Sequence, residues 1–137
     1  MTLTKKLGII LSDLCIELEL SYLLVSKIVS NTPLTVQTLL YLDHNKVYKN
    51  FKYPVENAAC KNVFKESFYL IAKSVHLEFP NDPDLKKLEI ESYAGIVLKK
   101  NSNIVGHLAI FDRKPISDEI RIETALRTSA IRIENII

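Results

Sequence analysis

Glycine is scarce in this sequence, and tryptophan is absent. The 137 residues contain only three glycines, Gly8, Gly95 and Gly106. Rossmann and P-loop proteins need several glycines close together, so that backbone N–H groups can approach a nucleotide phosphate. The three glycines of this chain cannot supply such a turn. These two classes of nucleotide-binding protein are therefore excluded.

Cysteine and histidine are also few. The two cysteines, Cys15 and Cys60, form no C-x-x-C pair, which argues against a disulfide framework and against a thiolate zinc site. His44, His76 and His107 have no mutual spacing that suits a metal ion. The sequence therefore predicts no metal site, leaves any cofactor unknown, and indicates a reducing compartment such as the cytoplasm.

Long hydrophobic runs and excess charge of one sign are missing as well. Asp13, Glu17 and Glu19 interrupt the apolar N-terminal stretch, so it does not reach the roughly 18 residues of a membrane span, and they spoil a signal-peptide interpretation. The formal net charge is +2, with Lys and Arg interspersed among acidic residues. We expect no membrane insertion and no direct binding of nucleic acid.

The hydrophobic residues, 47% of the chain, fall into periodic segments. At both ends of the sequence they recur at steps of three and four, which is typical of an amphipathic helix. The N-terminal helix is predicted at about 3–18, capped by Thr2 or Thr4, and the C-terminal helix at about 117–137, capped by Ser117. The second helix has no stop signal at its end.

Between these helices, segments rich in β-branched and aromatic residues alternate with turn signals, which predicts strands joined by hairpins. Asp82-Pro83 is a strong helix start, and Asn57 is the expected cap of another short helix. Segment 67–79 fits neither period. The predicted strands are 22–29, 34–42, 47–53, 92–99 and 104–112. This order describes an α+β class, one domain over 1–137 with sheet and pocket elements at about 21–115.

Three parts of the chain form a specific combination of motifs. They are ESYAGIVL at 91–98 with GHLAIFD at 106–112, FPNDPDL at 79–85, and YPVENAACKNV at 53–63. Together they resemble the E-S-Y-x-G-x-P-L, G-H-L-x-x-x-D, F-P-x-D-x-x-L and Y-x-L-x-G-T-P-C-x-x-V elements of the GAF domains of bacterial sensor and regulatory proteins. The chain departs from these patterns at 57–59, where Gly, Thr and Pro are usual, and at Val97, where Pro is usual.

The resemblance implies a GAF-like, PAS-related fold. Such a fold has a central antiparallel sheet of about six strands, terminal helices on one face, and short helices and loops over a pocket on the other. Segment 67–79 would supply the remaining strand. Aromatic side chains are typical walls of a small-molecule pocket, although they are equally typical of a core. The candidate pocket residues are Tyr53, Asn57, Cys60, Phe79, Tyr93 and Phe111.

No residue is assigned a catalytic role. Cys60 lies near a predicted helix N-terminus, where the pKa of a thiol can fall, but without a nearby resolving cysteine its expected role is packing. His107 is expected to make a structural hydrogen bond. Asp82 is explained as a helix cap, and Glu91 as a structural partner of a backbone group or a basic residue.

The resemblance implies a non-enzymatic sensor that binds a small molecule or a partner and transmits through its terminal helices to an output domain or protein. The apolar stripes of those helices favour a homodimer, unless both stripes pack on the domain's own sheet. One alternative is a ligand-free GAF-fold dimerisation module, which the altered 57–59 segment favours. Another is an enzyme similar to cysteine-dependent methionine sulfoxide reductases, which two cysteines in unlike positions disfavour.

Overall fold

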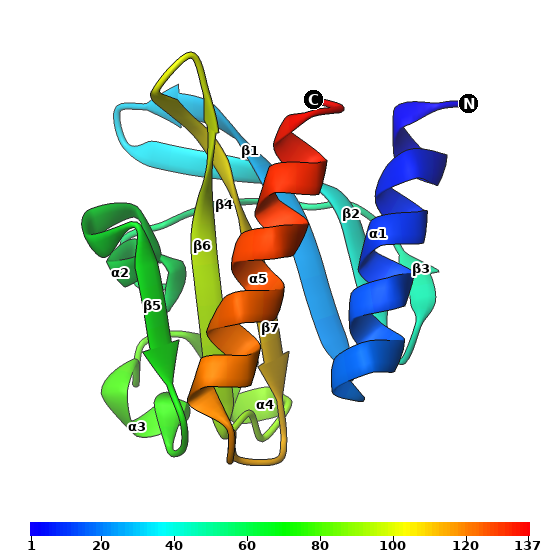
Figure 1. The fold of residues 1–137 in the computed structure, drawn as a ribbon. Helices are drawn as coiled ribbons and strands as arrows, with labels where there is room; N and C mark the ends of the chain where they lie inside the picture. The colour runs from blue at the N-terminus through cyan, green and yellow to red at the C-terminus, as the bar shows by residue number, and fades with distance from the viewer.

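A computed structural model describes all residues from Met1 to Ile137. Seven strands form one antiparallel sheet in the order β3-β2-β1-β7-β6-β5, and β4 also pairs with β2 (Figure 1). The strands are β1 (Tyr22–Asn31), β2 (Leu34–Asp43), β3 (Lys46–Tyr48), β4 (Lys52–Pro54), β5 (Phe68–Ile71), β6 (Ser92–Lys100) and β7 (Asn103–Asp112). The expected α+β class is confirmed.

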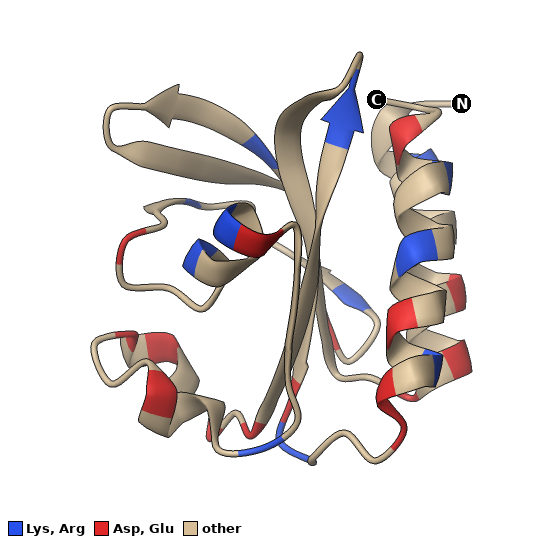
Figure 2. Ribbon diagram, turned by 60° about the vertical axis from the view of Figure 1, so that its left-hand side comes forward, with Lys and Arg blue, Asp and Glu red and all other residues tan.

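Helices cover both faces of the sheet. The helices are α1 (Leu3–Leu18), α2 (Cys60–Glu66), α3 (Val75–Glu78), α4 (Pro83–Lys87) and α5 (Glu119–Glu134). The two terminal helices, α1 and α5, lie together on one face, and the three short helices lie on the other (Figure 2). No helix is long and apolar enough to cross a membrane.

Helix α1 forms as the periodicity predicts. Thr2 caps it by accepting a hydrogen bond from the Lys5 N–H at 3.2 Å, and the left-handed backbone of Glu19 ends it. Its apolar stripe packs on the sheet, where Leu7 and Leu11 are completely buried. The apolar stripe of α1 therefore packs on the domain's own sheet and is not available for a dimer contact.

Helix α5 is shorter than the predicted 117–137. Asp118, instead of Ser117, caps it through the N–H of Arg121 at 3.0 Å. The helix stops at Glu134, because the N–H groups of the last two residues both turn back to the carbonyl of Ile133 at 3.0 and 3.1 Å. Glu123 and Arg127, one turn apart on this helix, form an ion pair with 2.8 Å between Oε2 and Nε.

The predicted strand 47–53 is interrupted. β3 and β4 both pair with β2. Between them Thr38 donates its N–H to the Phe51 carbonyl at 2.9 Å and also bonds to residues 50 and 51 through its side chain. Its Oγ1 accepts from the Phe51 N–H at 2.9 Å and donates to Asn50 Oδ1 at 2.9 Å. Val47 on β3 is exposed.

The segment between β4 and β6 contains the predicted strand and the predicted Asp82 cap, but not the predicted Asn57 cap. Asn57 does not cap α2, which begins at Cys60 without a side-chain cap. Segment 67–79 supplies β5, which pairs with β6, as the resemblance implied. Asp82 caps α4 by accepting from the N–H groups of Asp84 and Leu85 at 3.1 and 3.4 Å, with Pro83 in the first turn.

Two hydrophobic cores result from this layering. The larger lies between the sheet and the terminal helices, and the smaller lies between the sheet and the short helices. Cys15 belongs to the first and Cys60 to the second, so the sheet separates the two thiols. The side chains of the smaller core do not fill the space between the sheet and the short helices, and the remaining cavity is the candidate site.

Candidate functional site

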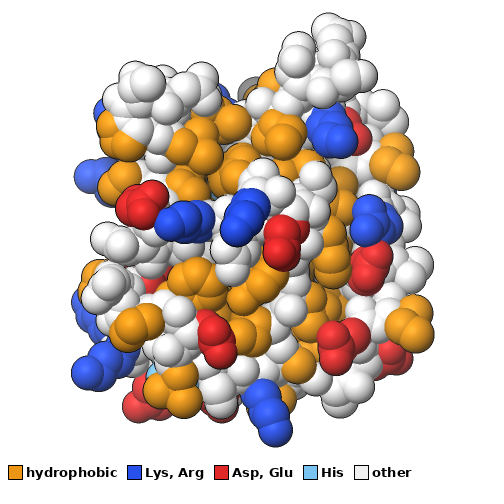
Figure 3. Space-filling model, turned by 90° about the vertical axis from the view of Figure 1, so that its left-hand side faces the viewer, with side chains coloured by type: hydrophobic (Ala, Val, Ile, Leu, Met, Phe, Trp, Pro, Cys, Tyr) orange, Lys and Arg blue, Asp and Glu red, His pale blue; other side chains and the backbone are white.

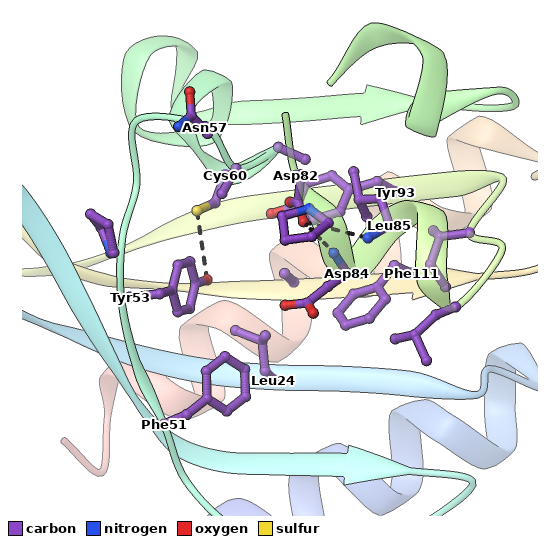
Figure 4. Close-up of a pocket in the computed structure, with 17 residues that line it drawn as sticks. Leu24, Phe51, Tyr53, Asn57, Cys60, Asp82, Asp84, Leu85, Tyr93 and Phe111 are labelled. Carbon is purple, nitrogen blue, oxygen red and sulfur yellow. Dashed lines mark hydrogen bonds between the residues drawn. The ribbon is translucent and has the colours of Figure 1, made fainter. Parts of the chain in front are cut away.

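A cavity of about 280 Å³ lies between the sheet and the short helices (Figure 4). Its floor comes from the sheet, with Leu24 on β1, Tyr93 on β6, and Ala109 and Phe111 on β7. Its walls come from the β4–α2 connection and from α4 with the residues after it. The wall residues are Phe51, Tyr53, Pro54, Asn57, Ala58, Ala59, Cys60, Asp82, Pro83, Asp84, Leu85, Leu88 and Ile90. Hydrophobic side chains lie exposed among charged ones on the side of the molecule shown in Figure 3.

The structure brings five of the six candidate residues together. Tyr53, Asn57, Cys60, Tyr93 and Phe111 all line the cavity. They come from four different parts of the chain, and the pairing of β6 with β7 places Tyr93 directly opposite Phe111.

Phe79 is the exception. It ends the four-residue helix α3, and its ring packs edge-on against Tyr69 with 6.2 Å between ring centroids. Phe79 is a partly buried member of the smaller core and does not line the cavity. The F-P-x-D-x-x-L motif contributes through Asp82 and Leu85 instead.

Polar side chains stand among the apolar walls. The hydroxyl of Tyr53 and the sulfur of Cys60 lie 3.6 Å apart at one end of the site. Burial is the main cause that raises the pKa of Tyr53 well above its ordinary value, and the neighbouring Cys60 raises it further. The hydroxyl of Tyr93 is fully buried and has no hydrogen-bond partner. It lies 3.2 Å from the position that a Cβ atom would take at Gly95, which does not line the cavity, so this hydroxyl is not available to a molecule in the cavity.

Cys60 is expected to be unreactive in the folded protein. Burial raises the pKa of its thiol to about 12. Cys60 is the first residue of α2, but burial outweighs the lowering that a helix N-terminus can cause. The thiolate is the nucleophile, and the side chain is 2% exposed. We therefore expect a Cys15→Ser variant to react with Ellman's reagent at least about 100-fold more slowly when folded than in denaturant. Equal rates in both states would contradict this assignment.

Asp82 and Asp84 bring negative charge to the wall. Burial raises the pKa of Asp82, and the nearby Asp84 carboxylate raises it further. The hydrogen bonds from the Leu85 and Asp84 N–H groups act in the opposite direction and lower this pKa. No Lys, Arg or His is among the lining residues. The sequence indicated Asp82 only as a helix cap, although its place in the F-P-x-D-x-x-L motif was a usable signal for the pocket wall.

The histidines and Glu91 lie outside the cavity. His107 forms the expected structural hydrogen bond, with its Nδ1 2.5 Å from Ser26 Oγ, and burial lowers its pKa to about 3. His76 Nδ1 lies 3.0 Å from the Ile90 carbonyl oxygen and 3.2 Å from Glu91 Oε2. Glu91 thus has the basic partner expected of it. No cluster of three or more potential metal ligands is present.

Comparison with solved structures identifies the architecture. The chain superposes on the GAF domain of A. aeolicus nlh2 in an inactive state with a TM-score of 0.71 and 18% identity, covering 97% of this chain and 81% of the other. For the GAF domain of the Acinetobacter phosphoenolpyruvate-protein phosphotransferase the TM-score is 0.76 at 10% identity, over 99% and 82%. The chain has the GAF fold.

An enzyme shares this GAF fold. The type II free methionine-R-sulfoxide reductase of Thermoplasma acidophilum matches with a TM-score of 0.69 and 11% identity, over 99% of this chain and 94% of the reductase. No protein-family model and no curated protein sequence matches the chain. At these identities the GAF fold is established, and the chemistry must be argued from the residues of the cavity.

Proposed function

We propose that this chain is a non-enzymatic GAF sensor domain that binds a small molecule in the cavity and regulates an output domain or partner protein through its terminal helices. The observation that carries the proposal is the cavity itself. It is lined mainly by apolar and aromatic side chains, with a few polar groups at fixed positions, which is the usual composition of a small-molecule site.

The neutral state of the thiol supports binding over catalysis. Cys60 is the only cysteine in the cavity wall, and burial raises the pKa of its thiol, which keeps it protonated at neutral pH. The sheet separates it from Cys15, the other cysteine of the chain. A cysteine-dependent sulfoxide reduction would need a resolving thiol within reach. Measurable reduction of free methionine sulfoxide that Cys60→Ala abolishes would overturn the non-enzymatic assignment.

Residues 112–114 supply the route from the cavity to α1. Arg113 Nε donates to the carbonyl of Leu88, a cavity residue, at 2.9 Å. The neighbouring Asp112 accepts from the Ser21 N–H at 2.8 Å, and Lys114 Nζ donates to the carbonyl of Glu19, the last-turn cap of α1, at 2.7 Å. A displacement of Leu88 by a ligand would therefore reach the end of α1 through three consecutive residues.

A thermal-shift screen tests whether the cavity binds small molecules. Because a ligand of the folded state raises Tm, we expect small apolar compounds to stabilise the wild type. Ala58→Phe places an aromatic ring in the cavity and should abolish these shifts, whereas Ala72→Phe, outside the cavity, should retain them. Compounds that stabilise all three proteins equally would contradict binding in the cavity.

A homodimer through the terminal helices is the second proposal. The inner stripes of α1 and α5 pack on the sheet, but the outer faces carry exposed isoleucines: Ile9 and Ile16 two turns apart on α1, and Ile120 and Ile131 three turns apart on α5. A ligand-free dimerisation module would use the same surface. Native mass spectrometry reports the oligomeric state, and we expect a dimer that Ile16→Lys converts to a monomer. A monomeric wild type would contradict this proposal.

A further inference from the structure

We propose that the cavity selects its ligand by charge and takes a compact, largely apolar amine that carries one positive charge. This inference rests on the proposed function and names the chemical class of its ligand. Two properties of the wall carry it: the sign of the lining charges and the aromatic rings.

All the charge on the cavity wall is negative. Asp82 and Asp84 carry the only carboxyl groups among the lining residues, and no basic side chain lines the cavity. Neither carboxylate forms an ion pair with another side chain. An anionic ligand would lose hydration on entry and would meet charge of its own sign, which raises the free energy of the complex.

Asp82 is fixed in place and still able to accept hydrogen bonds. Its Oδ1 accepts the two N–H groups at the start of α4, so the helix holds the carboxylate against the cavity. The backbone of Ala59 supplies a third hydrogen bond to this carboxylate. A carboxylate has about four acceptor positions, which leaves one for an ammonium group. Burial disfavours the charged form of Asp82, and a cation beside it would offset that penalty.

Aromatic rings complete a site for a cation. Phe51 and Tyr53 stack with 5.5 Å between their centroids, and Phe111 lies beside Tyr93 at 6.3 Å. The faces of these rings carry partial negative charge that attracts an ammonium group. Leu24 and the apolar floor then contact the hydrocarbon body.

Basic residues stand beside or near lining residues in the sequence, but none of them lines the cavity: Lys52, Lys61, Lys86, Lys87 and Arg113. Arg113 reaches the Leu88 carbonyl but does not itself line the cavity. Lys61 on α2 forms an ion pair with Glu56 at 3.0 Å. These side chains therefore do not convert the cavity into an anion site.

Three indole compounds of similar shape test the inference. Tryptamine is a cation at neutral pH, tryptophol is neutral, and indole-3-acetate is an anion. Titration calorimetry at pH 7 should show tryptamine binding at least about tenfold tighter than tryptophol, with indole-3-acetate weakest. Asp82→Asn combined with Asp84→Asn should remove the preference, because Asn still caps a helix and keeps α4 in place.

The outcomes separate this inference from the proposed function. Equal binding of tryptamine and tryptophol that Ala58→Phe abolishes would overturn the charge selection and leave the cavity as a binding site. Tightest binding of indole-3-acetate would overturn it in the same way. A preference for tryptamine that survives in the double Asn variant would assign the selection to other residues. No binding of any of the three compounds would count against both proposals.

Discussion

Replacing Gly106 with alanine is expected to destabilise the protein by at least about 3 kcal/mol. Gly106 on β7 pairs with Lys27 on β1, and a Cβ atom at Gly106 would lie 1.9 Å from the backbone oxygen of Ser26. This neighbour is backbone, so the two strands must separate to accept a methyl group. Urea unfolding of the wild type and Gly106→Ala measures the difference.

Gly8→Ala is the matched control. A Cβ at Gly8, inside α1, would meet no atom within 4 Å. Alanine in a helix interior is favoured over glycine by roughly 0.5–1 kcal/mol, so this variant should be slightly more stable than the wild type. A loss below about 1 kcal/mol in Gly106→Ala would show that β1 and β7 do not approach as closely as the structure indicates.

The buried His107 is expected to make the protein lose stability as pH falls below neutrality. Burial lowers the pKa of His107 to about 3 in the folded state, whereas an unfolded histidine titrates near 6.5. Between these values the unfolded state binds a proton that the folded state does not, so the free energy of unfolding falls as pH falls. This group alone should account for about 2 kcal/mol between pH 7 and pH 5.

The His107→Asn variant isolates this effect. Asn retains a hydrogen-bonding group near the position of Nδ1, which contacts Ser26, but it does not titrate. Urea unfolding at pH 7, 6 and 5 should therefore show a smaller decline for the variant than for the wild type. Identical pH dependence of the two proteins would mean that folded His107 accepts a proton as readily as unfolded His107 does.

The sequence predicted best where structure depends on adjacent residues. Thr2 and Asp82 cap their helices because each side chain reaches N–H groups two or three positions ahead. Asn57 has the same chemistry but no such role, because the backbone of its loop bonds to itself, with the Ala58 N–H donating to the Val55 carbonyl at 3.0 Å. A local pattern does not reveal that competition.

Contacts between distant segments account for the other differences. The break in strand 47–53 depends on Thr38, which belongs to another strand. The motif resemblance placed Tyr53, Cys60 and their neighbours near one pocket, but the direction of Phe79 depends on how a four-residue helix meets β5. The role of Asp84 as a wall residue likewise required the packing of α4 over the sheet.

The central claim is that the cavity between the sheet and the short helices is a small-molecule site coupled to α1. Two-dimensional ¹H–¹⁵N NMR during titration with a compound that stabilises the wild type tests it most directly. We predict saturable shifts of the amides of Ala58, Leu85 and Phe111, which line the cavity, together with Glu19 and Ser21 at the end of α1. Saturable binding that leaves the cavity amides unmoved, or moves them without Glu19 and Ser21, would contradict the claim.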